Sequence, residues 1–207
     1  MRLFAAVWPP EEVLDHLDLA LAAVRGATAG EDRGPVRWSA REVWHLTLAF
    51  YGVLPEGATP ALLAELGAVA AGTRAYELRL RGAGVFAHRT LWAGVAGDLE
   101  AHRALTRACA DAGAAVGASP DDRVRERPHL TVGRVRSGGA GGRRGRRPVH
   151  PHGARGPEPD EALVAALAVY DGPTWQVSSL RLVESVPGAG RGGGPLYTSL
   201  EELAFGV

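Results

Sequence analysis

The stretch WHLTLAF at residues 44–50 has a near copy, PHLTVGR, at residues 128–134. Each copy contains a histidine, a leucine and a threonine in that order, beginning at His45 and at His129. Both copies lie in apolar runs that predict β-strands, in which successive side chains point to opposite faces. We therefore expect the histidine and threonine of each copy on one polar face, with the intervening leucine facing the core. A single copy can arise in any buried strand, but two copies in different halves of the chain indicate a shared function.

The side chains on these two polar faces are suited to phosphoryl transfer. Imidazole titrates near neutral pH, so one ring can accept a proton while its partner donates one. The hydroxyls of Thr47 and Thr131, two residues after each histidine, are placed to hydrogen-bond phosphate oxygens. Two such units across a groove would set an acid and a base on opposite sides of one phosphorus, as in-line displacement requires. The residues alone leave open which histidine is the acid.

Other interpretations of the histidines fit the sequence less well. A lone histidine on a strand is usually structural, but the duplication argues against that role here. The His-x-Thr pattern lacks a second imidazole or carboxylate at metal-ligand spacing. His150 and His152 offer two imidazoles, yet they lie in an arginine-rich stretch that we interpret as a solvated loop. The Gly-x-Ser-x-Gly motif of serine hydrolases is absent from the sequence.

Strand and helix patterns mix along the chain in an α+β manner, without the strict alternation of a doubly wound sheet. Strands are predicted at 2–8, 36–39, 43–51, 76–81, 90–95, 127–136, 174–185 and 196–203. Helices are predicted from residue 10 onward, at 60–71, at 99–113 with a closing glycine, and at 161–169. Residues 26–35 and 137–159 lack periodicity and are predicted to be loops, the second of them mobile.

Composition excludes several classes of protein. The single cysteine, Cys109, excludes an intramolecular disulfide framework and a multi-cysteine zinc site. All 23 basic residues are arginine, so a P-loop, a Schiff base and a lysyl-AMP ligase nucleophile are excluded. No apolar run approaches the roughly 20 residues that cross a bilayer, and the N-terminus turns acidic before a signal-peptide core can form. We expect a cytoplasmic protein with no membrane association.

The net charge is zero, but the arginines are unevenly distributed. Residues 123–155 contain ten arginines and one acidic residue, Glu126, which gives a local charge of +9. Such a concentration suits an anionic partner, nucleic acid above all. The alternative is that the segment 137–159 is an inert insertion that reflects a GC-rich coding bias.

Beyond the two motifs, the sequence resembles the two-histidine phosphoesterases of the LigT type, bacterial RNA 2′,3′-cyclic phosphodiesterases also called 2′-5′ RNA ligases. The resemblance covers nearly the whole chain in order. It is carried by RLFAAV, VRWS, HLTLAFYG, VFAHRTLWAGV, RPHLTVGRVR, WQVSSLRLVES and LYTSLEEL. The arginine-rich segment 137–159 matches nothing diagnostic.

The resemblance implies one domain over residues 1–207, with two pseudo-twofold-related lobes and a central groove. Each lobe would be an antiparallel sheet backed by helices. The implied activity is hydrolysis of an RNA 2′,3′-cyclic phosphate to a 2′-phosphomonoester without metal or cofactor. The expected partner is RNA with such an end, or a related cyclic nucleotide, and we expect a monomer. Reversible 2′-5′ ligation, a small cyclic-nucleotide phosphodiesterase and a non-catalytic RNA-binding module are the alternatives.

The resemblance also assigns roles to residues. His45 would be the general acid that protonates the departing 3′ oxygen, and His129 the general base that activates water. Thr47 and Thr131 would hold the non-bridging phosphate oxygens. Arg134 matches an arginine common in the family and would add charge to the phosphate site. Phe4 and Trp38 are candidates for base stacking near the groove, and a core position is the favoured alternative for each. Arg134 has an odd offset from His129, so it can reach the groove only if a bulge or strand end reverses its direction.

Overall fold

The computed structural model describes residues 1–25, 36–119, 127–136 and 164–206. The described helices are α1 (Glu11–Arg25), α2 (Thr59–Ala71) and α3 (Leu99–Ala115), and residues 164–167, within the predicted helix at 161–169, are also helical. The described strands are β1 (Arg2–Val7), β2 (Val36–Trp38), β3 (Leu46–Val53), β4 (Tyr76–Phe86), β5 (Thr90–Gly97), β6 (His129–Val135), β7 (Asp171–Val177), β8 (Ser179–Val186) and β9 (Leu196–Ala204). The predicted loops at 26–35 and 137–159 lie outside the described residues.

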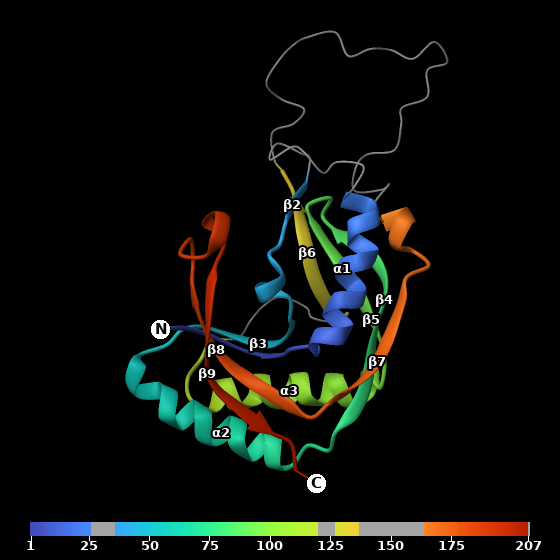
Figure 1. The fold of residues 1–207 in the computed structure, drawn as a ribbon. Helices are drawn as coiled ribbons and strands as arrows, with labels where there is room; N and C mark the ends of the chain where they lie inside the picture. Colours follow the sequence, from blue (N-terminus) through green and yellow to red (C-terminus); the bar gives the residue numbers. More distant parts are fainter. Residues whose placement is uncertain (26–35, 120–126, 137–163, 207) are drawn as a thin grey trace, which may run out of the picture.

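The described strands belong to one curled antiparallel sheet in the order β7-β4-β5-β6-β3-β1-β8-β9, and β2 pairs with β6 beside this path (Figure 1). The sheet divides into two four-stranded halves between β6 and β3. Their described pairing is limited to Leu46 with Leu130. The predicted α+β fold with two antiparallel halves is thus confirmed, and the halves share one continuous sheet.

The two motif strands share a backbone irregularity. In β3, Leu48 is skipped in the pairing with β1, because Thr47 pairs with Ala6 and Ala49 with Ala5. In β6, Val132 is skipped in the pairing with β5 in the same way. A one-residue bulge reverses the alternation of the side chains beyond it. The two halves therefore repeat each other in detail around the motifs.

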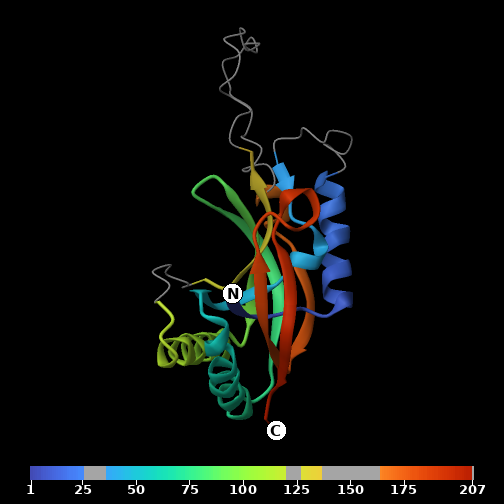
Figure 2. The ribbon, with the colours of Figure 1, turned by 90° about the vertical axis from the view of Figure 1, so that its left-hand side faces the viewer.

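Helices cover the sheet from two sides, with α1 on one side and α2 and α3 on the other (Figure 2). The buried residues of α1, Val13, Leu14, Leu17 and Leu21, recur at helical spacing. This apolar stripe packs α1 towards β7, while α3 packs on β3 and α2 packs on α3 and β9. In the described part of the chain, no helix is long and apolar enough to cross a membrane.

The predicted strand at 174–185 is two strands, β7 and β8, that lie in different halves of the sheet. Ser178 alone separates β7 from β8, and the two strands follow each other directly in Figure 1. The partner strands change at this residue. Sequence patterns report local conformation, so they did not reveal that the chain passes here from one half of the sheet to the other.

Two other predicted boundaries are wrong by a few residues. The helix expected to close at Gly113 continues to Ala115, and Gly117 follows it with a φ of 82°. Gly113 has a packing reason instead, since a Cβ there would lie 2.5 Å from the Tyr51 ring. The strand expected from residue 43 begins at Leu46, because residues 41–43 form a 3-10 turn.

Candidate active site

A groove of about 840 Å³ collects the residues of both motifs. From the set predicted by sequence, its lining includes His45, Thr47, His129, Thr131, Arg134 and Phe4. Six further residues with hydroxyl or aromatic side chains join them, namely Ser39, Phe50, Phe86, Thr90, Ser185 and Tyr197. The duplicated motif therefore forms one site between the halves of the sheet.

The two motifs lie side by side and run in opposite directions where β3 pairs with β6. The antiparallel pair of Leu46 with Leu130 places each motif histidine beside the threonine of the other motif along the strands. Both leucines are fully buried, whereas the flanking histidines and threonines are only half-buried. The predicted division into a core face and a polar face is confirmed. His45 precedes β3 by one residue, and His129 is the first residue of β6, so the histidines stand at strand starts.

Both imidazole rings are held by the backbone in the same way. The Nδ1 atom of His45 lies 2.8 Å from the carbonyl oxygen of Val43, and Nδ1 of His129 lies 3.0 Å from that of Arg127. A carbonyl oxygen only accepts hydrogen bonds, so Nδ1 carries the proton and donates it in each ring. The Nε2 atom is then the one that can gain or lose a proton.

The first motif contains a further hydrogen bond. The Oγ1 atom of Thr47 lies 3.1 Å from Nε2 of His45. With Nδ1 protonated, neutral Nε2 is an acceptor, and the threonine hydroxyl donates to it. When Nε2 takes a proton, this hydroxyl must turn away and becomes available to another oxygen in the groove.

Three aromatic rings surround His45. The Trp8 ring stacks on it with a centroid distance of 4.8 Å, and the rings of Phe4 and Tyr197 lie at 5.0 and 5.3 Å. The guanidinium of Arg181 lies 5.6 Å from the Trp8 ring on which His45 stacks. Sequence analysis proposed Phe4 as a base-stacking residue and missed Trp8 and Tyr197. Phe4 borders the groove against the His45 ring, but its side chain is only 3% exposed, as the core alternative predicts.

His129 has different surroundings from His45. The Phe86 ring lies nearly perpendicular to it, at a centroid distance of 4.8 Å, and the Trp92 ring lies at 6.2 Å. Phe86 comes from the end of β4, and Trp92 from the adjacent strand β5. The site is thus symmetric in its backbone but asymmetric in its ring contacts.

Arg134 reaches the groove because of the bulge in β6. Its offset from His129 would direct it to the opposite face of a regular strand. Because Val132 is skipped in the pairing with β5, the alternation of side chains reverses at that point, and Arg134 lines the groove. The expectation that a bulge is required is therefore confirmed.

Two more arginines, Arg2 and Arg127, line the groove and were missed by sequence analysis. Among the described residues that line it there is no carboxylate, so the groove is cationic. Burial raises the pKa of the Tyr197 phenol, and the charges of Arg134 and Arg2 oppose this shift. Tyr197 is protonated at neutral pH and can donate a hydrogen bond into the groove.

Trp38 is absent from the described lining of this groove. It borders a separate small cavity with Leu91 and Val132, and the guanidinium of Arg25 lies 4.9 Å from its ring. The alternation along β2 places Trp38 on the same face as the buried Val36. Trp38 packs against the core, as the favoured alternative predicts, and the base-stacking assignment is not supported.

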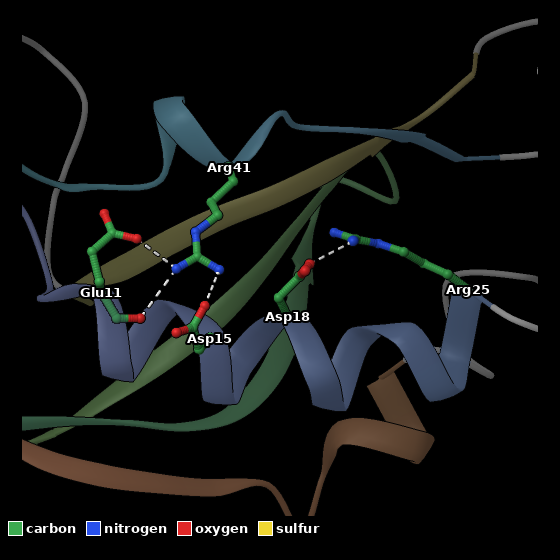
Figure 3. Close-up of polar contacts among 5 residues, drawn as sticks. All are labelled: Glu11, Asp15, Asp18, Arg25 and Arg41. Atoms are coloured by element: carbon green, nitrogen blue, oxygen red, sulfur yellow. Dashed lines mark hydrogen bonds and ion pairs between the residues drawn. The ribbon is translucent and has the colours of Figure 1, made fainter.

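The segment that leads into the first motif is tied to α1, which also carries an ion pair of its own (Figure 3). Arg41 contacts the Glu11 and Asp15 carboxylates at 2.6 and 2.7 Å, and it also bonds the Glu11 carbonyl oxygen. Within α1, Arg25 contacts Asp18 at 2.7 Å. Arg41 lies four residues before His45, so these contacts join the segment before the first motif to α1.

No group of three or more His, Cys, Asp or Glu side chains that could hold a metal ion occurs within residues 1–25, 36–119, 127–136 and 164–206. The histidine pair considered in the sequence, His150 and His152, lies outside these ranges.

Comparison with known proteins identifies the family. The profile of the 2′-5′ RNA ligase superfamily matches residues 10–172, and the chain belongs to this superfamily. A relative from Methanothermobacter thermautotrophicus, named RNA 2′,3′-cyclic phosphodiesterase, is 29% identical over 97% of both chains. A relative of the same name from Geobacillus stearothermophilus is 34% identical over 50% of this chain, and the match spans 33% of that relative's length.

Solved structures show the same fold. LigT from E. coli in its apo form superimposes with a TM-score of 0.67 at 21% identity, over 100% of this chain and 98% of LigT. A protein from Thermus thermophilus superimposes with a TM-score of 0.64 at 24% identity, over 99% of this chain and 98% of that protein.

Proposed function

We propose that this chain hydrolyses 2′,3′-cyclic phosphate ends of RNA to 2′-phosphomonoesters by paired-histidine catalysis, without a metal. The observation that carries the proposal is that His45 and His129 line one cationic groove with the same ring nitrogen tied to the backbone. Two relatives named RNA 2′,3′-cyclic phosphodiesterase support the substrate class. The likeness to the E. coli protein supports the fold, and the residues of the groove support the chemistry.

In this mechanism, Nε2 of His129 accepts a proton from water, and the resulting hydroxide attacks the phosphorus. The bond from phosphorus to the 3′ oxygen breaks, and Nε2 of His45 donates its proton to that oxygen. The products are a 3′ hydroxyl and a 2′-phosphomonoester, with one proton taken up by His129 and one given up by His45. Each Nδ1–H remains bonded to a carbonyl oxygen throughout, which supports the imidazolium form of either ring.

The order of the two roles rests on the family resemblance, and the ring contacts support it. The general acid must enter the reaction as an imidazolium ion. Aromatic rings attract cations, and His45 has three of them within 5.3 Å, whereas His129 has Phe86 at 4.8 Å and Trp92 at 6.2 Å. The asymmetric surroundings therefore favour His45 as the acid.

The remaining residues would hold the phosphate. Arg134 supplies a charge that opposes the negative charge of the phosphorane-like transition state. The Thr131 hydroxyl donates to a non-bridging oxygen. Thr47 does the same once Nε2 of His45 is protonated, because its hydroxyl is then released from that nitrogen. Phe4 and Tyr197 border the place where the terminal base would lie.

An assay of product identity tests the proposal. The protein is incubated, with EDTA present, with an oligoribonucleotide that ends in a 2′,3′-cyclic phosphate, and the product isomer is identified. We expect the 2′-phosphate as the product at the rate seen without chelator. A 3′-phosphate product, or activity that is lost in EDTA and restored by zinc or manganese, would contradict the mechanism.

The same assay separates the alternatives. A chain that binds the oligonucleotide without product would be an RNA-binding module. Turnover of a cyclic mononucleotide but not of the oligonucleotide would indicate a small cyclic-nucleotide phosphodiesterase. Adding an RNA with a free 5′ hydroxyl reveals ligation, since a 2′-5′ linkage would then form instead of the phosphomonoester.

A further inference from the structure

A second groove, of about 540 Å³, adjoins the catalytic groove on the side of His129. Three arginines from three different elements line it: Arg81 from β4, Arg103 from α3, and Arg127 just before β6. We call it the arginine groove. Arg127 lines both grooves, so the two meet at this residue.

Strand pairing places the arginine groove next to the catalytic groove. Gly94, which lines it, is the β5 partner of His129. Trp92 also lines it, and its ring lies 6.2 Å from the His129 ring and 5.7 Å from the Arg127 guanidinium. A chain that leaves the catalytic groove beside His129 therefore passes Arg127 and enters the arginine groove.

The charges of the arginine groove are available for binding. Within the described part of the chain, no carboxylate lines it, and neither Arg103 nor Arg127 forms a salt bridge. Arg81 has a carboxylate, that of Asp171, at 3.9 Å, but Asp171 is held more closely by Arg79 at 3.0 Å. All three arginines of the groove are exposed. Guanidinium groups present paired N–H donors that match phosphate oxygens.

We propose that the arginine groove binds the phosphodiester backbone of the RNA strand on the 5′ side of the terminal cyclic phosphate. This inference rests on the proposed function, because it assumes an RNA strand attached to the terminal nucleotide. Arg127 contacts the first phosphate of that strand, and Arg103 and Arg81 contact those that follow. Backbone contacts of this kind do not depend on base sequence.

The test compares two double variants with equal changes in charge. Arg81→Gln/Arg103→Gln removes two arginines of the groove. The control, Arg74→Gln/Arg107→Gln, removes two exposed arginines outside it, and Arg107 lies one turn beyond Arg103 on the same helix. For each protein, kcat/KM is measured on 2′,3′-cyclic AMP and on an octaribonucleotide with a cyclic phosphate end. The Kd of a labelled octaribonucleotide with a 3′-phosphate is measured from low to high salt.

We expect the groove variant to act on the cyclic mononucleotide within about twofold of wild type. Its KM and Kd for the octaribonucleotide should rise roughly tenfold or more at low salt, since charged contacts to phosphate are lost. The slope of log Kd against log salt should fall by about 1.4, from two contacts at about 0.7 each for a single strand. The control variant should match wild type on both ligands.

Equal octaribonucleotide Kd values and salt slopes for the groove variant and the control would overturn the inference. The Kd measurement tests the inference independently of the proposed function. If wild type hydrolyses neither substrate, the proposed function fails, while the difference in Kd between the variants still decides whether the groove binds RNA. Equal displacement of the octaribonucleotide by an aspartate octapeptide would also overturn the assignment to RNA.

Discussion

Leu46 and Leu130 form the described backbone pair that joins the two halves of the sheet. Their side chains are 1% and 0% exposed, and each is flanked by the histidine and threonine of a motif. The packing of this pair therefore determines how the two motifs are placed relative to each other. Core stability and catalytic geometry are coupled at this point.

Truncating Leu130 should lower kcat by more than its effect on the free energy of unfolding explains. Leu130→Ala leaves a cavity and should lower the free energy of unfolding by about 2–5 kcal/mol, as measured by urea denaturation. Leu180→Ala is the matched control, because Leu180 is equally buried but lies in β8. We expect similar losses of stability and a larger fall in kcat for Leu130→Ala at temperatures where both variants are folded. Equal kcat values would show that the pair does not set the geometry of the site.

The hydroxyl of Thr47 should matter more for the reaction than for the fold. Thr47→Val removes the donor to His45 and to the phosphate, which should cost about 1–3 kcal/mol of transition-state stabilisation. This cost corresponds to a loss of roughly 5- to 150-fold in kcat/KM. Thr47→Ser keeps the hydroxyl and should stay near wild type. A Thr47→Ser variant as impaired as Thr47→Val would point to the methyl group and its packing instead.

Trp8 should contribute to catalysis through its stacking on His45. If the ring stabilises the imidazolium, Trp8→Leu should lower kcat by roughly 3- to 30-fold, which corresponds to about 0.5–2 kcal/mol of cation–π attraction. Trp8→Phe retains an aromatic face and should lose less. The measurement is steady-state kinetics on a cyclic mononucleotide. Equal losses in the two variants would exclude a cation–π contribution.

His102 should make the fold sensitive to acid. Its side chain is 1% exposed on α3, and its Nδ1 lies 2.9 Å from the Tyr76 hydroxyl. Burial, with the nearby charge of Arg103, lowers the pKa of His102 from 6.5 to about 4. The unfolded chain therefore binds a proton at higher pH than the folded chain does. The contribution of His102 to stability is complete above pH 6.5 and is lost as the pH falls towards 4.

The expected loss from this residue is roughly 2–3 kcal/mol between pH 7 and about pH 4.5. It is measured as the difference in the free energy of unfolding by urea at the two pH values. His102→Gln can still hydrogen-bond Tyr76 but does not titrate, so its loss should be smaller than that of wild type by this amount. The same pH dependence in wild type and His102→Gln would assign the acid sensitivity to other groups.

The sequence was most informative where function and local pattern coincide. The alternation around His45 and His129 predicted both polar faces, and the odd offset of Arg134 correctly required a bulge. The missed residues Trp8 and Tyr197 come from segments far from the motifs in sequence, and only the pairing and curl of the sheet bring them to His45. Arg127 lies two residues before His129 and could have been found from that spacing.

Strand pairing, which sequence patterns do not record, also explains the errors in the predicted fold. Ser178 alone separates β7 from β8 in the predicted strand at 174–185, yet the pairing partners change there. Trp38 was named as a candidate for base stacking near the groove, with a core position as the favoured alternative. Its strand pairs with β6, and its ring packs under Arg25 instead. Adjacency in sequence was a poor guide at Ser178, because strand pairing sets the neighbours.

The central claim is that His45 protonates the leaving oxygen and His129 activates water. On a natural substrate, His45→Ala and His129→Ala should each lower turnover by roughly 10²–10⁴ with an unchanged circular dichroism spectrum. The natural substrate alone does not order the two roles, because both losses are of the same size.

The most direct measurement uses a cyclic substrate in which sulfur replaces the 3′ bridging oxygen. A thiolate leaves without needing a proton, so general-acid catalysis becomes dispensable. We predict that His45→Ala turns over this substrate at nearly the wild-type rate, while His129→Ala remains impaired by roughly 10²–10⁴. Equal impairment of both variants on the sulfur substrate, or rescue of His129→Ala instead of His45→Ala, would contradict the assigned roles.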